Sequence, residues 1–436
     1  MKTIQTLIFI CLSTWSFGQN NTANKLAAYM QAQADVNDFS GVVLVTRNDS
    51  ILLKQSYGFA DYEWHVKNTT DTKFQLASVT KQFTAAAILI LVEEGKLSLT
   101  DRLSQFYPDF PKADSVTIHM LLSHSSGQAL GFKELALSTM HADSAYAAIK
   151  RMPYVFSPGT GSGYSNIGYY LLGKIIEQVS GDSYARFLNE NIFKKVGMKN
   201  TGVSDNNTVV LHKARVYQRS ETGFIHNPYI NWQINRGHDG IYSNVEDLAA
   251  WDKALYGTSI LSAKSKQIMF TAYNADSYGY GFLINPFYNH GHQLIAHDGG
   301  FFGTMTSFNR FTEDKIFITV LSNNESLSYL IAYGLSGILF EKDVELPYKH
   351  QAVKIDTRGY NKFVGNYEND IKILTRDNKL FYNSMETELI PESETKFFRA
   401  DNNERTIEFI QDKSGSYSRI IVTKAGVKES YKRKRN

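Results

Sequence analysis

The 436-residue chain contains a single cysteine, Cys11. That residue lies in an apolar N-terminal stretch with small residues at 16–18, which is the pattern of an export signal peptide. We expect residues 1–18 to be removed, so that the mature chain begins near Gln19. The mature protein would then have neither a disulfide bond nor a thiol nucleophile, and it would be periplasmic or secreted.

Long apolar runs and an excess of one charge are also absent. After the N-terminus, no stretch reaches the roughly 18 uninterrupted apolar residues of a membrane-spanning helix, so the mature chain is expected to have no transmembrane segment. Lys and Arg number 46, against 43 for Asp and Glu. This balance gives no electrostatic case for a nucleic-acid partner.

Several signatures of enzyme chemistry are missing. The chain has no Gly-Xaa-Ser-Xaa-Gly segment of an α/β-hydrolase and no Walker loop for phosphates. His290 and His292 could form a metal-binding pair, but neither a Glu nor a third ligand lies at a useful spacing. We therefore expect no metal and no cofactor. Other histidines, such as His119 and His124, are interpreted as structural.

The segment Ser78-Val79-Thr80-Lys81 precedes an apolar run over 85–92. The run is apolar nearly all round, which predicts a helix buried in a core, with Gly95 just past its end. Ser78 and Lys81 are three residues apart, so on a helix they share one face. A hydroxyl and an amine placed in this way can form an activated nucleophile. The alternative is an ordinary helix start, where Ser is common.

The same spacing occurs again at Ser393 and Lys396. That second copy lies in polar sequence with no apolar helix behind it, so we interpret it as a surface loop. The context therefore favours Ser78 and Lys81 as the candidate pair.

The order of predicted elements indicates an α+β fold. A hairpin is predicted over 40–46 and 51–56, helices over 167–179 and 245–256, further strands over 279–284, 293–297, 304–311 and 316–321, and a closing helix over 327–339. Strands at both ends predict one antiparallel sheet built from both chain ends, with helices on its faces and an inserted helical region. We place this main domain at 19–345, a linker at 346–356 and a small all-β domain at 357–436.

Two further motifs are candidates for chemistry. In Tyr164-Ser165-Asn166 a loop meets a predicted helix, so Ser165 or Asn166 could be an N-cap. Alternatively, Tyr164 could carry a proton while Asn166 holds Lys81 or the substrate. His297-Asp298-Gly299-Gly300 is either a glycine-rich turn or a strand edge whose backbone N–H is left open by the glycines.

Taken in order, Ser78 to Lys81, Tyr164 to Asn166 and His297 to Gly299 resemble the serine β-lactamase and penicillin-binding-protein superfamily. The chain is most similar to the branch of class C β-lactamases, D,D-carboxypeptidases, D-aminopeptidases and related esterases. The resemblance covers about 35–345. The segment 121–127 also resembles this group, and the all-β part with 363–367 is similar to the small barrel appended to many such hydrolases.

The resemblance implies a role for each motif residue. Ser78 would be the acylated nucleophile, and Lys81 and Tyr164 would share its proton and pass it to the leaving group. Asn166 would orient them. The backbone N–H groups of Ser78 and Gly300, with Gly299 beside them on the strand edge, would form an oxyanion hole.

His297 stands where the family often has Lys in a Lys-Thr-Gly motif, so a fixed cation for a substrate carboxylate is missing. The implied function is an exported serine hydrolase that acts through an acyl-enzyme on a small ester, amide or peptide. One alternative is a β-lactamase or D,D-peptidase acting on penicillins or peptidoglycan peptides. The other is a non-catalytic binding or sensing protein on the same fold.

Overall fold

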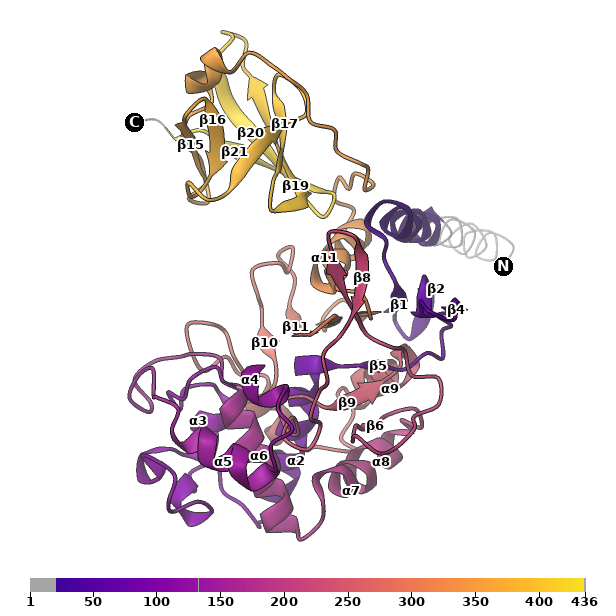
Figure 1. Cartoon of the computed structure of the whole chain (residues 1–436), viewed down its shortest axis with the longest axis vertical. Coiled ribbons are helices and arrows are strands. Elements are labelled where there is room, and N and C mark those ends of the chain that lie inside the picture. The colour runs from indigo at the N-terminus through magenta and orange to yellow at the C-terminus, as the bar shows by residue number, and fades with distance from the viewer. Residues whose placement is uncertain (1–20, 132, 435–436) are drawn as a thin grey trace, which may run out of the picture. The chain divides into compact units, whose positions relative to one another are not determined.

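The structure is a computed structural model that describes residues 21–131 and 133–434. It contains two compact units, one formed by Phe39–Ala332 and the other by the described parts of Met1–Asp38 and Tyr333–Asn436 (Figure 1). The predicted signal peptide at 1–18 lies outside the described residues. Among the described residues, no helix combines the length and apolar character needed to cross a membrane.

The unit Phe39–Ala332 contains a six-stranded antiparallel sheet in the order β10-β11-β12-β13-β1-β2. Its strands are β10 (Leu283–Ile284), β11 (Leu294–Phe301), β12 (Thr304–Phe311), β13 (Ile316–Ser322), β1 (Gly41–Arg47) and β2 (Ser50–Tyr57). β1 pairs with β13 from Gly41 opposite Ser322 to Arg47 opposite Ile316. The predicted sheet from two distant parts of the chain is therefore confirmed.

The predicted strand over 279–284 is wrong for most of its length. Only Leu283 and Ile284 are extended in β10, because the chain turns tightly just before them. Gly281 has a φ of +70°, and the N–H of Gly279 donates to the carbonyl of Phe282 at 2.9 Å. By contrast, the predicted strand over 293–297 extends to Phe301 in β11.

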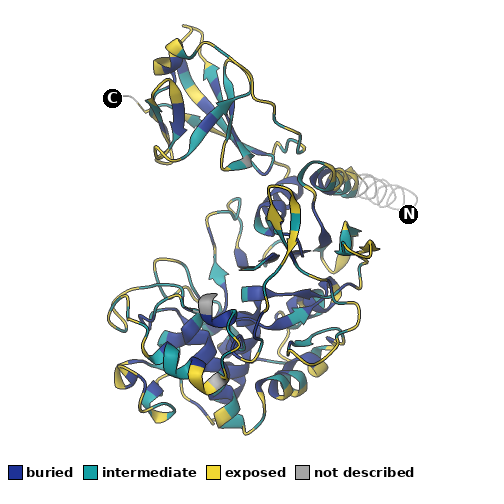
Figure 2. Cartoon of the chain, in the orientation of Figure 1, coloured by how far each residue is buried: buried dark blue, intermediate teal, exposed yellow. Residues whose placement is uncertain are grey.

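The centre of this unit is α2 (Thr80–Glu93), in which every residue from Thr80 to Leu91 is buried. Buried residues, in dark blue, gather in the middle of this unit (Figure 2). Burying each large aliphatic side chain contributes about 1.5–3 kcal/mol. As predicted, the helix ends just before Gly95, whose φ is +68°. The helices of this unit also include α3 (Ile118–Leu122), α4 (Lys133–Ala136), α5 (Ala142–Lys150), α6 (Asn166–Ser180), α7 (Tyr184–Leu188), the π-helical turn η4 (Asn189–Phe193), α8 (Lys194–Val196), α9 (Val245–Ala254) and α10 (Ala263–Met269).

Short elements complete the unit. The 3₁₀ turns are η1 (Ala77–Val79), η2 (Leu103–Gln105) and η3 (Ala113–Ser115). Two small sheets have two strands each, β3 (Phe59–Asp61) with β4 (Val66–Lys67) and β7 (Tyr217–Ser220) with β8 (Gly223–His226). In a third, β9 (Ile241–Ser243) lies between β5 (Phe74–Gln75) and β6 (Gly202–Val203). The buried Arg310 of β12 donates to Asp252 of α9 at 2.6 Å, which joins the large sheet to the helices.

The second unit contains a helix over 21–37, the end of α11 (Ser328–Leu339), the 3₁₀ turn η5 (Thr357–Lys362) and an eight-stranded antiparallel sheet in sequence order. The strands are β14 (Gly365–Asn366), β15 (Lys372–Arg376), β16 (Lys379–Tyr382), β17 (Glu388–Pro391), β18 (Lys396–Arg399), β19 (Asn402–Gln411), β20 (Tyr417–Lys424) and β21 (Val427–Lys432). Ser393 lies in the turn before β18, where its Oγ accepts from the N–H of Lys396 at 2.9 Å. Ser393 is thus in a turn, as interpreted from sequence, whereas Lys396 is the first residue of β18.

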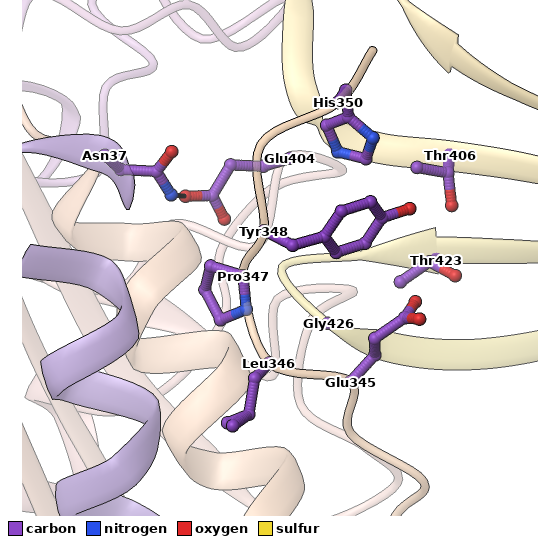
Figure 3. A pocket seen from close by; sticks show the side chains of 10 residues that line it. All are labelled: Asn37, Glu345, Leu346, Pro347, Tyr348, His350, Glu404, Thr406, Thr423 and Gly426. Atoms are coloured by element: carbon purple, nitrogen blue, oxygen red, sulfur yellow. Dashed lines mark hydrogen bonds between the residues drawn. The ribbon is translucent and has the colours of Figure 1, made fainter. Parts of the chain in front are cut away.

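A small cavity in this second unit contains a carboxylate without a cation (Figure 3). Its lining includes Asn37 from the N-terminal helix, Tyr348 from the linker, and Glu404 and Thr406 from β19. Asn37 donates to Oε1 of Glu404 at 2.8 Å, and no Lys, Arg or His of the described chain lies within ion-pair distance of this carboxylate. Burial therefore raises the pKa of Glu404 from 4.5 to about 7.

This raised pKa predicts a pH-dependent stability. Because the folded state holds the proton more tightly than the unfolded state, the contribution of Glu404 is fully present below about pH 4.5 and is lost as the pH rises through about 7. Glu404→Gln should therefore unfold with less dependence on pH, and at about pH 8 it should be more stable than wild type. Because the side chain is partly exposed, we expect a difference of about 1–2 kcal/mol.

Denaturant unfolding of both proteins at about pH 5 and pH 8 measures this difference. Glu394→Gln, in an exposed turn, is the matched control. An equal pH dependence of wild type and Glu404→Gln would contradict the interpretation.

Candidate active site

Ser78 lies in η1, directly before α2. The residue before it, Ala77, has a φ of +47°, in the left-handed region that side chains with a Cβ seldom occupy. Two hydrogen bonds hold this turn in place. The N–H of Leu76 donates to the carbonyl of Ile241 at 2.8 Å, and Oγ1 of Thr306 donates to the carbonyl of Leu76 at 2.7 Å. The strands on both sides thus fix the position of the Ser78 hydroxyl.

Lys81 lies one helical turn further on and is fully buried. Its Nζ is 3.1 Å from Oγ of Ser78 and donates to the carbonyl of His238 at 2.8 Å. Burial lowers the pKa of Lys81 from 10.5 to about 7, and the negative charge of Asp239 opposes this shift. An amine with this pKa is substantially neutral at neutral pH, so it can accept the proton of Ser78.

Tyr164 approaches Ser78 from the other side. Its hydroxyl donates to Oγ of Ser78 at 2.6 Å, and Nζ of Lys81 lies 4.8 Å from the centre of its ring. Burial raises the pKa of Tyr164 well above 10, so the phenol keeps its proton. Ser165 caps α6 by accepting from the N–H of Gly168 at 3.2 Å, which confirms the predicted N-cap and fixes the chain next to Tyr164.

Asn166 is the first residue of α6. The sequence suggested that it holds Lys81 or the substrate. In the described chain, no hydrogen bond joins its side chain to Lys81, and the buried Oδ1 of Asn166 has no partner there. The orienting role of Asn166 therefore stays a prediction.

The third motif lies on β11, where His297 and Gly299 face η1 and Asp298 points to the opposite face of the sheet. A Cβ on Gly299 would lie 2.4 Å from the carbonyl oxygen of Leu76. Only glycine therefore lets β11 approach the Ser78 turn this closely. Asp298 accepts hydrogen bonds from Ser307 at 2.6 Å and from Tyr288 at 3.0 Å, on the face away from Ser78.

His297 is a neutral hydrogen-bond acceptor at this edge. Its Nδ1 lies 2.7 Å from the carbonyl oxygen of Asp298, and because a carbonyl only accepts, Nδ1 carries the hydrogen. Burial, with the nearby Lys81, lowers the pKa of His297 to about 3, so Nε2 bears a lone pair. This Nε2 is buried and has no hydrogen-bond partner in the described chain.

The backbone of Gly300 faces the open edge of β11. β10 pairs with β11 at Ile295 and Ala296, and within the described residues no strand pairs with β11 on that side from His297 onward. The N–H of Asn285 donates to the carbonyl of Leu294 at 2.7 Å, so the backbone groups of Leu294 point to the β10 edge. Backbone groups alternate sides along a strand, and the N–H of Gly300 therefore points to the same edge. This placement suits the predicted oxyanion donor.

Sequence reasoning missed one buried charge near Lys81. Asp239 is 3% exposed, and its Oδ1 accepts from the N–H of Gly240 at 2.6 Å. Burial raises the pKa of Asp239 from 3.8 to about 6, although Lys81 and Lys213 oppose the shift. Gly237 and Gly240 flank His238-Asp239, and this pattern indicates a turn. It does not indicate that the turn lies beside Lys81.

The metal pair is not supported by the geometry. Nδ1 of His292 lies 2.9 Å from a carboxylate oxygen of Asp314. Within the described residues, no three His, Cys, Asp or Glu side chains are grouped so that they could hold a metal ion.

Comparison with known proteins adds independent findings. A family model described as Beta-lactamase matches residues 26–329. Penicillin-binding protein 4* of Bacillus subtilis is 29% identical over 457 aligned residues, which cover 95% of this chain and 100% of the relative. The octameric penicillin-binding protein homologue from Pyrococcus abyssi is 25% identical with a TM-score of 0.69, covering 94% and 99% of the two chains.

D-amino acid amidase from Ochrobactrum anthropi has the same fold, with 24% identity, a TM-score of 0.62 and coverage of 74% of this chain and 96% of the other. The fold and these matches define a serine hydrolase of the β-lactamase and penicillin-binding-protein superfamily. The chain belongs to the beta-lactamase family, whose model covers more than half of it. The resemblance and the fold class expected from sequence are thereby confirmed.

Because the charge of Asp239 raises the pKa of Lys81, we expect it to shift the pH dependence of kcat/KM. If Lys81 is the base, as predicted from sequence, it accepts a proton only when it is neutral, so kcat/KM should rise with pH through about 7 and level off above. The carboxylate of Asp239 raises the pKa of Lys81, so Asp239→Asn should move this rise to lower pH. Glu246 is an exposed carboxylate at the start of α9, and Glu246→Gln should leave the pH of this rise unchanged. A pH–rate profile that does not move in Asp239→Asn would contradict this electrostatic link.

Proposed function

We propose that the protein is an exported serine hydrolase that forms an acyl-enzyme at Ser78 and acts on small esters, amides or peptides without a carboxylate near the scissile bond. One observation carries this proposal. Lys81 Nζ and Tyr164 OH both lie within hydrogen-bond distance of Ser78 Oγ, at 3.1 and 2.6 Å. A nucleophile with a buried amine on one side and a neutral phenol on the other has both a base and an acid.

In the acylation step, Ser78 Oγ attacks the carbonyl carbon and its proton passes to neutral Lys81. Tyr164 gives its proton to the leaving group, and Lys81 then returns a proton to Tyr164. The net transfer moves the serine proton to the leaving group. The N–H groups of Ser78 and Gly300 would stabilise the oxyanion, each contributing about 3 kcal/mol in enzymes of this kind.

Deacylation reverses the proton path. A water molecule attacks the acyl carbon and loses a proton to the pair of Lys81 and Tyr164. The pair returns a proton to Ser78 Oγ as the acyl bond breaks, which releases the carboxylic acid and restores the hydroxyl.

The substrate class is inferred from His297. A cationic side chain at this position would attract a carboxylate, whereas Nε2 of His297 is an uncharged acceptor. It suits a substrate that offers a hydrogen-bond donor, such as an amide N–H, a hydroxyl or an amine. Asp298 lies on the far face of the strand, so the preference rests on His297 alone.

The second candidate is a β-lactamase or D,D-peptidase. The relative in Bacillus subtilis is named a penicillin-binding protein and spans nearly the whole chain, which supports recognition of penicillins. A binding or sensing protein on the same fold would keep the pocket without turnover. The pairing of base and acid on Ser78 favours the enzyme.

Export is proposed from the apolar stretch at the N-terminus and the small residues at 16–18. The mass of the protein recovered outside the cytoplasm reports whether about 18 residues have been removed.

The proposed nucleophile is tested by covalent labelling. A fluorophosphonate should label wild type at Ser78, and Ser78→Ala should lose the label with a change in unfolding free energy below about 1 kcal/mol. Ser393→Ala is the matched control, because Ser393 has the same spacing to a lysine in an exposed turn. Labelling that persists in Ser78→Ala would overturn the proposal. Label without turnover of any ester, amide or penicillin would favour the binding protein.

The substrate preference is tested with His297→Lys. Wild type should hydrolyse neutral esters or amides faster than matched carboxylate-bearing analogues, and the variant should shift the ratio of kcat/KM toward the carboxylates by about 1–3 kcal/mol. His297→Gln, which is polar but uncharged, should not shift it in this way. A wild type that already prefers penicillins or D-Ala-D-Ala peptides would give precedence to the second candidate.

A further inference from the structure

The segment that carries Tyr164 is held on both sides by one residue, His124. The N–H of Gly163 donates to the carbonyl of His124 at 2.9 Å, and the N–H of Ser165 donates to its Nδ1 at 3.1 Å. Gly163 and Ser165 are the two chain neighbours of Tyr164. A single residue therefore fixes the backbone before and after the phenol.

The ring of His124 also packs against the ring of Tyr164. Their centres are 4.6 Å apart with an angle of 32° between the planes. The ring centres of Tyr278 and Tyr169 lie 4.7 Å and 5.1 Å from the centre of the same imidazole. His124 is only 1% exposed. The imidazole is thus enclosed, and it limits the directions in which the phenol can move.

The protonation state of His124 is set by these contacts. Because Nδ1 accepts from the N–H of Ser165, the ring hydrogen lies on Nε2. Burial, together with Lys81 and His297, lowers the pKa of His124 well below 6.5. The ring is therefore neutral, and the lone pair that Ser165 needs is always present at neutral pH.

The backbone of His124 is itself strained. Its φ is +57°, in a region that non-glycine residues seldom occupy. Strain of this kind persists where the surroundings favour one conformation strongly, and it is concentrated at functional sites. At His124 the strained conformation brings both the carbonyl and Nδ1 toward the Tyr164 segment.

We propose that His124 is a positioning residue, which holds the Tyr164 hydroxyl at hydrogen-bond distance from Ser78 Oγ. This inference rests on the proposed role of Tyr164 as the proton donor. A shift of about 1 Å in a catalytic group can cost about 10²-fold in rate. His124 itself touches neither Ser78 Oγ nor the site of the leaving group through any hydrogen bond of the described chain.

Two variants separate the contacts of His124 from its backbone strain. His124→Gly relieves the positive φ but removes the acceptor and the ring, and it should lower kcat by about 10²-fold with little change in KM. In His124→Asn, the asparagine tolerates the same φ, and its Oδ1 is bonded to Cγ as Nδ1 of histidine is, so it can accept from the N–H of Ser165. The variant should therefore recover kcat to within about 10-fold of wild type. His119→Asn is the matched control, because His119 contacts Tyr273 and Tyr280 instead.

A double-mutant cycle with Tyr164→Phe tests whether His124 acts through Tyr164. In that background, His124→Gly should cost less than about 3-fold, since the hydroxyl that it positions is already absent. An equal loss of kcat in both backgrounds would overturn the proposal. So would a His124→Gly enzyme that keeps wild-type kcat.

A crystal structure of His124→Gly gives a readout that does not depend on turnover. The proposal requires the Tyr164 hydroxyl to move away from its position 2.6 Å from Ser78 Oγ. An unchanged position would overturn the positioning role, even if Ser78 is confirmed as the nucleophile. Conversely, a displaced hydroxyl in a protein without turnover would support the positioning role and contradict only the proposed enzyme function.

Discussion

The burial of one amine, that of Lys81, is the constraint on which the rest of the structure depends. Removing an ammonium from water is costly, and the protein limits this cost by lowering the pKa of Lys81 to about 7 and by giving its Nζ a carbonyl acceptor at His238. The amine can be buried only because α2 is enclosed on nearly all sides, with its apolar run in the core. The helices that lie in sequence between β2 and β10 contribute to this enclosure.

The sheet supplies the second half of the site. β11 and β12 are brought next to η1 because Thr306 binds the carbonyl of Leu76 and because Gly299 has no side chain to prevent contact. Strands from late in the chain thus determine the position of Ser78, the proposed nucleophile, near its beginning. Tertiary hydrogen bonds, rather than local helix propensity, hold the unusual backbone at Ala77.

Features with a local cause could be predicted from sequence. The buried α2 follows from a continuous apolar run, the end of α6 at Gly181 from a glycine at the helix end, and the Ser78–Lys81 contact from a spacing of three residues. The positions of Asp239 beside Lys81 and of His124 beside Tyr164 could not be predicted, because their contacts depend on residues distant in sequence. The prediction of a strand over 279–284 was wrong because the side-chain pattern alone does not reveal the turn at Gly281.

The charges around Lys81 explain why a histidine suits the strand edge. His124, His238 and His297 all surround this amine, and burial together with Lys81 lowers the pKa of each of them. A lysine in place of His297 would bring a second cation to the same buried region, where repulsion would lower the proton affinity of Lys81 further. Among the described residues, Asp239 is the acid whose charge raises that affinity. With an uncharged acceptor at His297, the amine retains a pKa near neutrality, which is the condition for its proposed action as a base.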